Sequence, residues 1–325
     1  MRHRFLASVP ALMVVTAAVS LWAAKTWTAP RTPDGQPDLQ GIWSNATITP
    51  LERPRELAGK QFFTEQEARE YEKRILQESN KDRRDGDREA DVGRAYNDAW
   101  WDRGTRVVPT RRTSMVVDPA DGRVPALTPA AQQREASRIE ALRRPARGPE
   151  DRGLPERCIQ WPTAGPPMLP SAYNNNYQIL QTPGYVVIFI EMIHDVRIIP
   201  LDGRPHLASN IRQWLGDSRG HWEGDELVVD TTNFTDKAPF RGSDRNLHLI
   251  ERFKRIDAET ILYRFTVDDP AAFTKPWSGE APLTRTPGPI YEYACHEGNY
   301  GMTNILSGAR ADEKAAEEAA KGGVK

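Results

Sequence analysis

Ionisable side chains interrupt an otherwise apolar, β-branched segment in the second half of the chain. The stretch "VVIFIEMIHDVRI" places Glu191, His194, Asp195 and Arg197 among valines and isoleucines. Leaving such a group buried and unpaired costs several kcal/mol, so each one must be paired or face a wet pocket. A histidine oriented by a carboxylate serves as a general acid or base, and an arginine stabilises developing negative charge.

We therefore predict His194 as the catalytic acid or base, with Asp195 or Glu191 orienting its ring. Arg197 would stabilise the negative charge that develops in the reaction. The alternative is structural: Arg197 forms an ion pair with Asp195 or Glu191 and does no chemistry.

A second set of catalytic candidates comprises His248 and Glu251 in "NLHLIERF" and His296 in "YEYACHEG". On a strand, residues three apart point to opposite faces, so neither "EMIH" nor "HLIE" chelates a metal without a turn or bulge. A metal-dependent enzyme would need His194, His248 and His296 to converge from separate strands, with zinc as the expected ion. Because the sequence has no strict metal-ligand motif, we expect no cofactor and keep zinc as an alternative.

Aromatic and amide side chains mark two candidate ligand walls. The segments "YNDAWWDRGT" and "SAYNNNYQ" supply the candidate binding residues Trp100, Trp101, Arg103, Tyr173, Asn176 and Tyr177. In one interpretation the rings pack on the protein core and the asparagines form turns. In the other, the two segments hold a small, partly apolar molecule or a carbohydrate.

The beginning of the chain favours export. Residues 1–24 have a basic head, an apolar run and small residues near Ala23, which is typical of a cleaved signal peptide. An uncleaved anchor is the alternative; after cleavage we expect no membrane span. Export to the periplasm or the medium makes a Cys158–Cys295 disulfide the preferred state of the two cysteines. Buried free thiols or a reactive thiol are the other possibilities.

Composition restricts the function further. The 325 residues are 38% hydrophobic and 27% charged, with a net charge of −1, which is typical of a globular chain. The sequence has no concentrated basic segment of the kind that would indicate nucleic-acid binding. The sequence contains no nucleophile elbow, phosphate loop or dinucleotide fingerprint, which argues against nucleotide hydrolysis and nicotinamide chemistry. It assigns no oligomeric state.

Three parts follow the leader. Residues 25–150 are predicted to be irregular, with a hairpin around Asp121-Gly122 and helices at 64–79 and 129–143, packing on a barrel. Thr64 with Glu67 forms a capping box for the first helix, and Thr128 caps the second, which begins with a proline. Residues 151–308 are predicted to form an antiparallel β core, and residues 309–325 a disordered or helical tail.

The β core is predicted from short alternating runs joined by tight turns. Examples are "HWEGDELVVDTTNF", which turns at Glu223-Gly224-Asp225, and the pair "NLHLIERFKRI" and "ETILYRFTVDD"; "PIYEYACHEG" is expected to be the last strand. Such spacing without helical crossovers favours an antiparallel barrel or a sandwich with two or three peripheral helices.

Several longer motifs carry a family resemblance. "PDGQPDLQGIW", "YNDAWWDRGT", "YNNNYQILQTPGYVVI", "IRQWLGDSRGHWEGDELVVDTTNF" and "YEYACHEGNYGM" together resemble a large family of secreted bacterial proteins with no assigned activity. The "GIW" of the first motif is similar to the Gly-x-Trp that opens the first strand of lipocalin-type barrels. The resemblance implies secretion and a lipocalin-like (calycin-like) barrel, and it assigns no residue a role.

These observations lead to three functional hypotheses. The first is an exported small-molecule enzyme, a lyase, isomerase or hydrolase that uses acid–base chemistry in an aromatic-lined barrel pocket. The second is a periplasmic protein that binds a small ligand without catalysis. The third is the metal-dependent enzyme that would use the three histidines.

Overall fold

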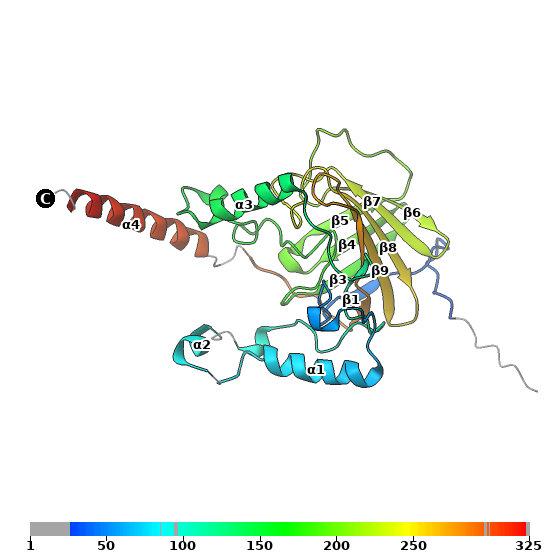
Figure 1. The fold of residues 1–325 in the computed structure, drawn as a ribbon. Coiled ribbons are helices and arrows are strands. Elements are labelled where there is room, and N and C mark those ends of the chain that lie inside the picture. Colours follow the sequence, from blue (N-terminus) through cyan, green and yellow to red (C-terminus); the bar gives the residue numbers. More distant parts are fainter. Residues whose placement is uncertain (1–26, 85, 94–96, 296–297, 299, 323–325) are drawn as a thin grey trace, which may run out of the picture.

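A single antiparallel sheet curls into a nearly closed barrel in the computed structural model, which describes residues 27–84, 86–93, 97–295, 298 and 300–322 (Figure 1). Its strands are β1 (Gly41–Ser44), β2 (Val116–Asp118), β3 (Asn176–Thr182), β4 (Tyr185–Ile190), β5 (Val196–Pro200), β6 (Asp217–Glu223), β7 (Glu226–Thr232), β8 (His248–Arg255), β9 (Thr260–Asp268), β10 (Trp277–Glu280) and β11 (Leu283–Arg285). The prediction of a mainly β, antiparallel barrel is confirmed. The predicted signal peptide lies outside the described residues.

The strand order β5-β4-β3-β1-β11-β9-β8-β7-β6 leaves β5 and β6 as the two edges, while β10 pairs with β9 and β2. The two edges lie side by side without a backbone ladder, and an Arg197–Ser218 hydrogen bond of 3.3 Å joins them. The hairpins β6–β7 and β8–β9 lie where the sequence predicts them.

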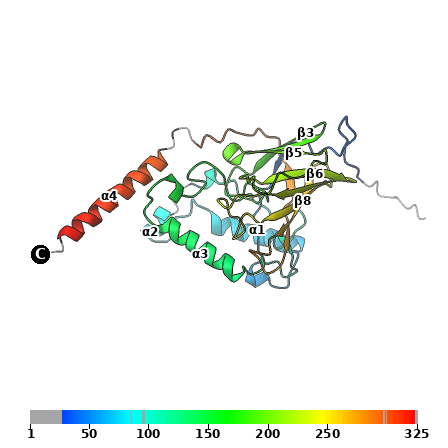
Figure 2. The ribbon, with the colours of Figure 1, turned by 90° about the horizontal axis from the view of Figure 1, so that it is seen from above.

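In the described part of the chain four α-helices accompany the barrel: α1 (Glu65–Ser79), α2 (Arg88–Gly93), α3 (Pro129–Arg143) and α4 (Gly301–Gly322). Thr64 and Glu67 form the predicted capping box of α1, and the Thr128 hydroxyl accepts a hydrogen bond from Ala131 N at the start of α3. In two views α1 and α3 lie beside the barrel while α4 extends away from it (Figures 1 and 2). The described part of the predicted tail is therefore helical.

Two expected elements are different in the structure. Asp121-Gly122 lies in a tight turn, with Gly122 at φ +73° and its N–H donating to Pro119 O, but β2 pairs with β10 and forms no local hairpin. Prolines at 119 and 125 remove two backbone donors that a returning strand would need. The described part of "PIYEYACHEG" is not a strand either; Pro287 precedes it, Pro289 is its first residue, and Tyr293 and Cys295 pack against the barrel core.

Large side chains fill the centre of the barrel. Phe253, Tyr263, Phe265 and Trp277 form a chain of ring contacts with centroids 4.9 to 5.8 Å apart, and Met168 from a loop is fully buried with them. The interior is thus packed with side chains at this level. The interpretation of the ionisable strand residues had supposed a hollow interior instead. No helix in the described part of the chain is long and apolar enough to span a membrane.

Candidate functional site at one end of the barrel

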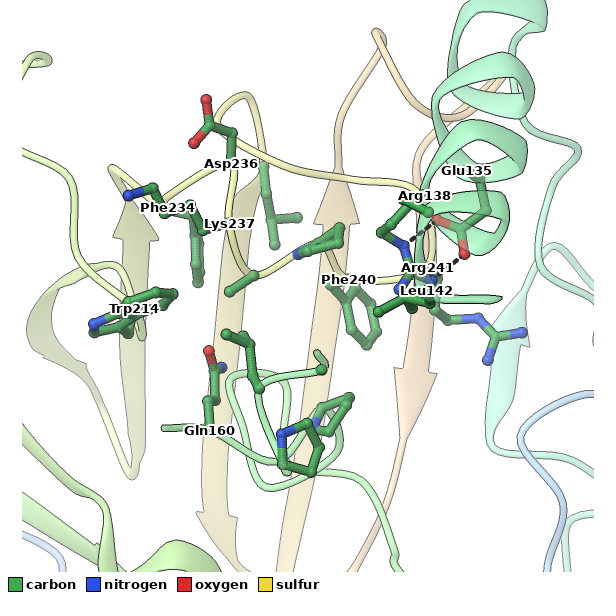
Figure 3. A pocket seen from close by; sticks show the side chains of 18 of the residues that line it. Glu135, Arg138, Leu142, Gln160, Trp214, Phe234, Asp236, Lys237, Phe240 and Arg241 are labelled. Atoms are coloured by element: carbon green, nitrogen blue, oxygen red, sulfur yellow. Dashed lines mark hydrogen bonds and ion pairs between the residues drawn. The ribbon is translucent and has the colours of Figure 1, made fainter. Parts of the chain in front are cut away.

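A cavity of about 1050 Å³ lies between α3 and the loops at one end of the barrel (Figure 3). This is the end at which β6 and β8 begin and β7 and β9 finish, which we call the α3 end. Its wall is mixed. The apolar part includes Leu127, Leu142, Trp214, Phe234, Phe240 and Phe273, and charged side chains such as Asp151, Arg152 and Lys237 make up much of the rest. A volume of this size accommodates a drug-sized or larger ligand.

Local chemistry at the start of α3 fixes one side of the cavity. Thr128 caps the helix through its hydroxyl, which also donates to Ala271 O at 2.8 Å, and its backbone N–H donates to Ala272 O at 2.8 Å. Leu127 forms an isolated bridge with Phe273, which follows β9. These contacts join α3 to the chain that leaves β9, so that the helix covers the α3 end of the barrel.

The cavity also contains polar groups. The Oε1 atom of Gln160 is buried and accepts no hydrogen bond, although an amide oxygen away from water normally has a donor. The rim carries two ion pairs: Arg138 with Glu135 (Figure 3), and Arg241 with Glu52. Such a wall suits a partly apolar molecule with a hydrogen-bond donor for Gln160.

The predicted catalytic residues lie at the same end of the barrel, on the turn between β4 and β5. Glu191 is buried and accepts hydrogen bonds from Asn176 Nδ2 at 2.8 Å and Tyr291 N at 3.1 Å. His194 is exposed, and its Nδ1 lies 3.0 Å from Tyr293 O; because a carbonyl only accepts, Nδ1 carries the proton in this contact. The ring therefore hydrogen-bonds to the peptide backbone, not to either of the carboxylates expected to orient it.

Asp195 is the most unusual of these groups. Burial raises the pKa of its carboxyl to about 6, and neighbouring His194 only partly offsets this. Its Oδ2 atom is buried without a hydrogen-bond partner. Ile193 and His194 both have positive φ, 60° and 49°, which is strained for residues with side chains and is a feature of functional turns.

Arg197 forms a buried ion pair, but with a different partner from those expected. Its guanidinium makes a bidentate contact with Glu251 of β8, in which Nη1 lies 3.0 Å from Oε1. Tyr263 donates to the same carboxylate at 2.9 Å. Burial opposes the charge on Arg197, but Glu251 more than compensates and raises the arginine pKa. The expected pairing with Asp195 or Glu191 is wrong because the side chain crosses the barrel interior to β8.

His248 lies on the outer wall of the barrel, away from the turn that carries His194. Its Nε2 is 2.9 Å from Asp230 Oδ2, and this hydrogen bond raises the histidine pKa. In the described part of the chain no three His, Cys, Asp or Glu side chains are grouped closely enough to hold a metal ion. His296, the third histidine of the zinc hypothesis, lies outside the described residues.

The predicted ligand walls lie elsewhere. Trp100 is 65% exposed, and Trp101 lies under Lys81 and Arg103 with cation-to-ring distances of 4.9 and 5.6 Å. Tyr173 packs on Trp161, and Tyr177 is buried in the barrel with its hydroxyl donating to Ala164 O at 3.2 Å. As described, the cavity wall includes none of the six predicted binding residues.

Sequence reasoning therefore missed the residues that form the cavity. Their signals were present but dispersed: Trp214 follows β5 in "IRQWLG", and Phe234 and Phe240 flank the Pro-containing "TDKAP" after β7. Gln160 belongs to the segment that the disulfide fixes, because Cys158 is bonded to Cys295 as predicted. Bringing these segments together requires the barrel, which no local pattern specifies.

Comparison of the chain with family models, with curated proteins and with solved structures finds no match. The nearly closed barrel is consistent with the barrel that the family resemblance implies. The site must therefore be interpreted from its own chemistry.

Proposed function

We propose that this is an exported protein that binds a small, partly apolar molecule in the cavity at the α3 end of the barrel. The observation that carries the proposal is the cavity itself, whose wall combines several aromatic and aliphatic side chains with the unpartnered Gln160 oxygen. Burial of apolar ligand surface would supply most of the affinity, and one donor on the ligand would orient it. The aliphatic and aromatic part of the wall favours such a molecule over a carbohydrate.

Export to the periplasm or the medium is part of the proposal. The Cys158–Cys295 disulfide and the signal-like residues 1–24 both support it, because disulfides persist in oxidising compartments. Binding without catalysis is favoured because the described cavity wall contains no histidine and His194, Asp195 and Glu191 lie outside it.

Fluorescence titration with anilinonaphthalenesulfonate, an amphiphile that brightens in apolar sites, tests the proposal. Trp214→Ala should weaken binding by about tenfold, the change expected when roughly 1.4 kcal/mol of contact is lost. Trp100→Ala is the matched control, since it removes an exposed tryptophan from the ligand wall that the sequence predicted. Equal affinity for wild type and W214A, or a loss with W100A instead, would reject the cavity.

Acid–base catalysis at the β4–β5 turn is the second candidate. It is supported by Asp195, whose raised pKa of about 6 and unpartnered oxygen suit a proton-transferring group near neutral pH. In this proposal Asp195 moves the proton, and His194, whose Nδ1 contacts Tyr293 O, assists through Nε2. A lyase, isomerase or hydrolase activity that is lost in both Asp195→Asn and His194→Gln would support it, whereas turnover unaffected by both changes would exclude it.

A further inference from the structure

His206 stands between two carboxylates on the outer wall of the barrel. It belongs to the loop of residues 201–216, which joins β5 to β6 and carries Trp214 of the cavity wall. Its Nδ1 lies 3.0 Å from Asp217 Oδ2, and its Nε2 lies 3.0 Å from Asp230 Oδ1. The His206 side chain is only 28% exposed.

This geometry requires a particular protonation state. An ionised carboxylate can only accept hydrogen bonds, so two carboxylates need two N–H donors from one ring. The imidazolium has both donors, whereas neutral imidazole has one donor and one lone pair. Loss of the proton therefore breaks one of the two contacts and places a lone pair against a carboxylate oxygen.

The surrounding charges maintain the two aspartates as acceptors. Burial disfavours the charge of Asp217, yet its hydrogen bonds from Leu207 N, His206 and Arg219 lower its pKa. The pKa of Asp230 is lowered, chiefly by the hydrogen bond from His248 and less by that from His206. Arg219 also donates to Pro205 O at 3.0 Å, and Asp268 of β9 faces His248.

The same contacts hold the loop to the barrel. Leu207 N donates to Asp217 Oδ2 at 2.9 Å, and Asn233 Nδ2 donates to Leu207 O at 3.0 Å. Further along, Gln213 N donates to Asn233 O at 3.0 Å, one residue before Trp214. Asn233 therefore connects the part of the loop next to His206 with the part next to Trp214.

We propose that protonated His206 is a pH-dependent clamp that holds the 201–216 loop on the barrel and so positions Trp214 in the cavity wall. His206 is a positioning residue and does not contact the ligand. The clamp is engaged below the pH at which its imidazolium loses a proton and is released above it. Its effect on ligand affinity rests on the proposed function; its effect on the loop does not.

Hydrogen–deuterium exchange of the full chain tests the loop directly. After correction for intrinsic exchange rates, protection of a peptide covering 201–216 should fall about tenfold between about pH 5.5 and about pH 9, the size expected for one charge-assisted hydrogen bond. His206→Gln, which stays neutral, should show the lower protection at both pH values. His221→Gln should retain the wild-type change, because His221 is an exposed histidine whose ring pairs with Glu223, at 3.1 Å, on the same strand.

Three outcomes of the exchange experiment would overturn the clamp. Protection that is the same at the two pH values in wild type does so, and so does a pH response that persists in H206Q or disappears in H221Q. Asp230→Asn replaces the carboxylate on the barrel side with a neutral amide, which can accept from or donate to Nε2. It should therefore abolish the pH response while leaving the loop sequence unchanged.

Titration with anilinonaphthalenesulfonate, whose sulfonate stays ionised over this range, separates the clamp from the proposed function. Wild type should bind the probe severalfold more weakly at the higher pH, and H206Q should not change with pH. If the exchange of the loop depends on pH as predicted but the affinity for the probe does not, the coupling of the clamp to Trp214 is overturned. Absence of probe binding at every pH overturns the proposed function and leaves the exchange result to decide the clamp alone.

Discussion

Arg197 of β5 and Glu251 of β8 form a fully buried ion pair across the inside of the barrel, between strands that are not neighbours in the sheet. Because β5 is one edge of the sheet, this pair and the Arg197–Ser218 contact hold the edge in place where no backbone ladder exists. The pair explains why charged residues occur in these apolar strands without requiring them to act on a ligand.

Removing one member of this pair should destabilise the protein strongly. Glu251→Gln or Arg197→Met leaves an uncompensated buried group, for which a loss of about 3–5 kcal/mol in unfolding free energy is expected. The double variant should be less destabilised than the sum of the single variants. Urea denaturation of the four proteins measures this coupling, and strictly additive losses would contradict a direct interaction.

The disulfide should stabilise the fold because it closes a long loop. Its cysteines are separated by 137 residues, and the simple chain-entropy account gives about 5 kcal/mol for a loop of that length. We expect a clear fall in melting temperature for Cys158→Ser/Cys295→Ser. Reductant should lower the wild-type melting temperature toward this value and leave the double variant unchanged. No fall in either experiment would show that the bond contributes little.

The cap of α3 should matter for both stability and binding. Thr128→Ala removes the hydroxyl that accepts from Ala131 N and donates to Ala271 O, which should cost about 1–2 kcal/mol of unfolding free energy. Thr64→Ala is the matched control, since it removes the equivalent cap from α1, whose residues do not line the cavity. Both variants should unfold more easily, but only T128A should weaken probe binding. Equal effects of the two variants on binding would show that the cap of α3 does not specifically shape the ligand site.

Asp195 should make stability depend on pH in a recognisable direction. Burial raises its pKa in the folded state to about 6, so the folded protein favours the neutral carboxyl. The contribution of Asp195 to the unfolding free energy is greatest below about pH 4, the pKa of its carboxyl in the unfolded chain. This contribution is lost as the pH rises through about 6. Asp195→Asn should therefore stabilise the protein near neutral pH and have little effect near pH 4, as measured by urea denaturation at both pH values. Greater stability of wild type at neutral pH would contradict the assignment.

Local chemistry in the sequence was sufficient to predict several elements. Thr64 with Glu67, and Thr128 followed by Pro129, define the helix starts because caps act within one turn. Asp225 and Gly224 mark the β6–β7 turn, where Gly224 has a φ of +61° that favours glycine. Alternation of polar and apolar residues predicted the antiparallel strands.

Contacts between distant segments could not be predicted in the same way. The partner of Arg197 is 54 residues away, so no local pattern distinguishes Glu251 from the nearer Glu191 and Asp195. The cavity wall is drawn from segments between residues 52 and 273, and it exists only once the barrel brings their ends together. The adjacent tryptophans Trp100 and Trp101 were a stronger local signal than the isolated Trp214. Trp100 is nevertheless 65% exposed, whereas Trp214 is 37% exposed and lines the cavity.

Photoaffinity labelling of the full chain with an aliphatic amphiphile that carries a diazirine tests the location of the ligand most directly. After irradiation and digestion, the account predicts labelled peptides from residues 150–166 and 234–241, which line the cavity, with labelling suppressed by excess unmodified amphiphile. Competed labelling confined to residues 97–103 and 173–177, or no competed labelling anywhere, would contradict it.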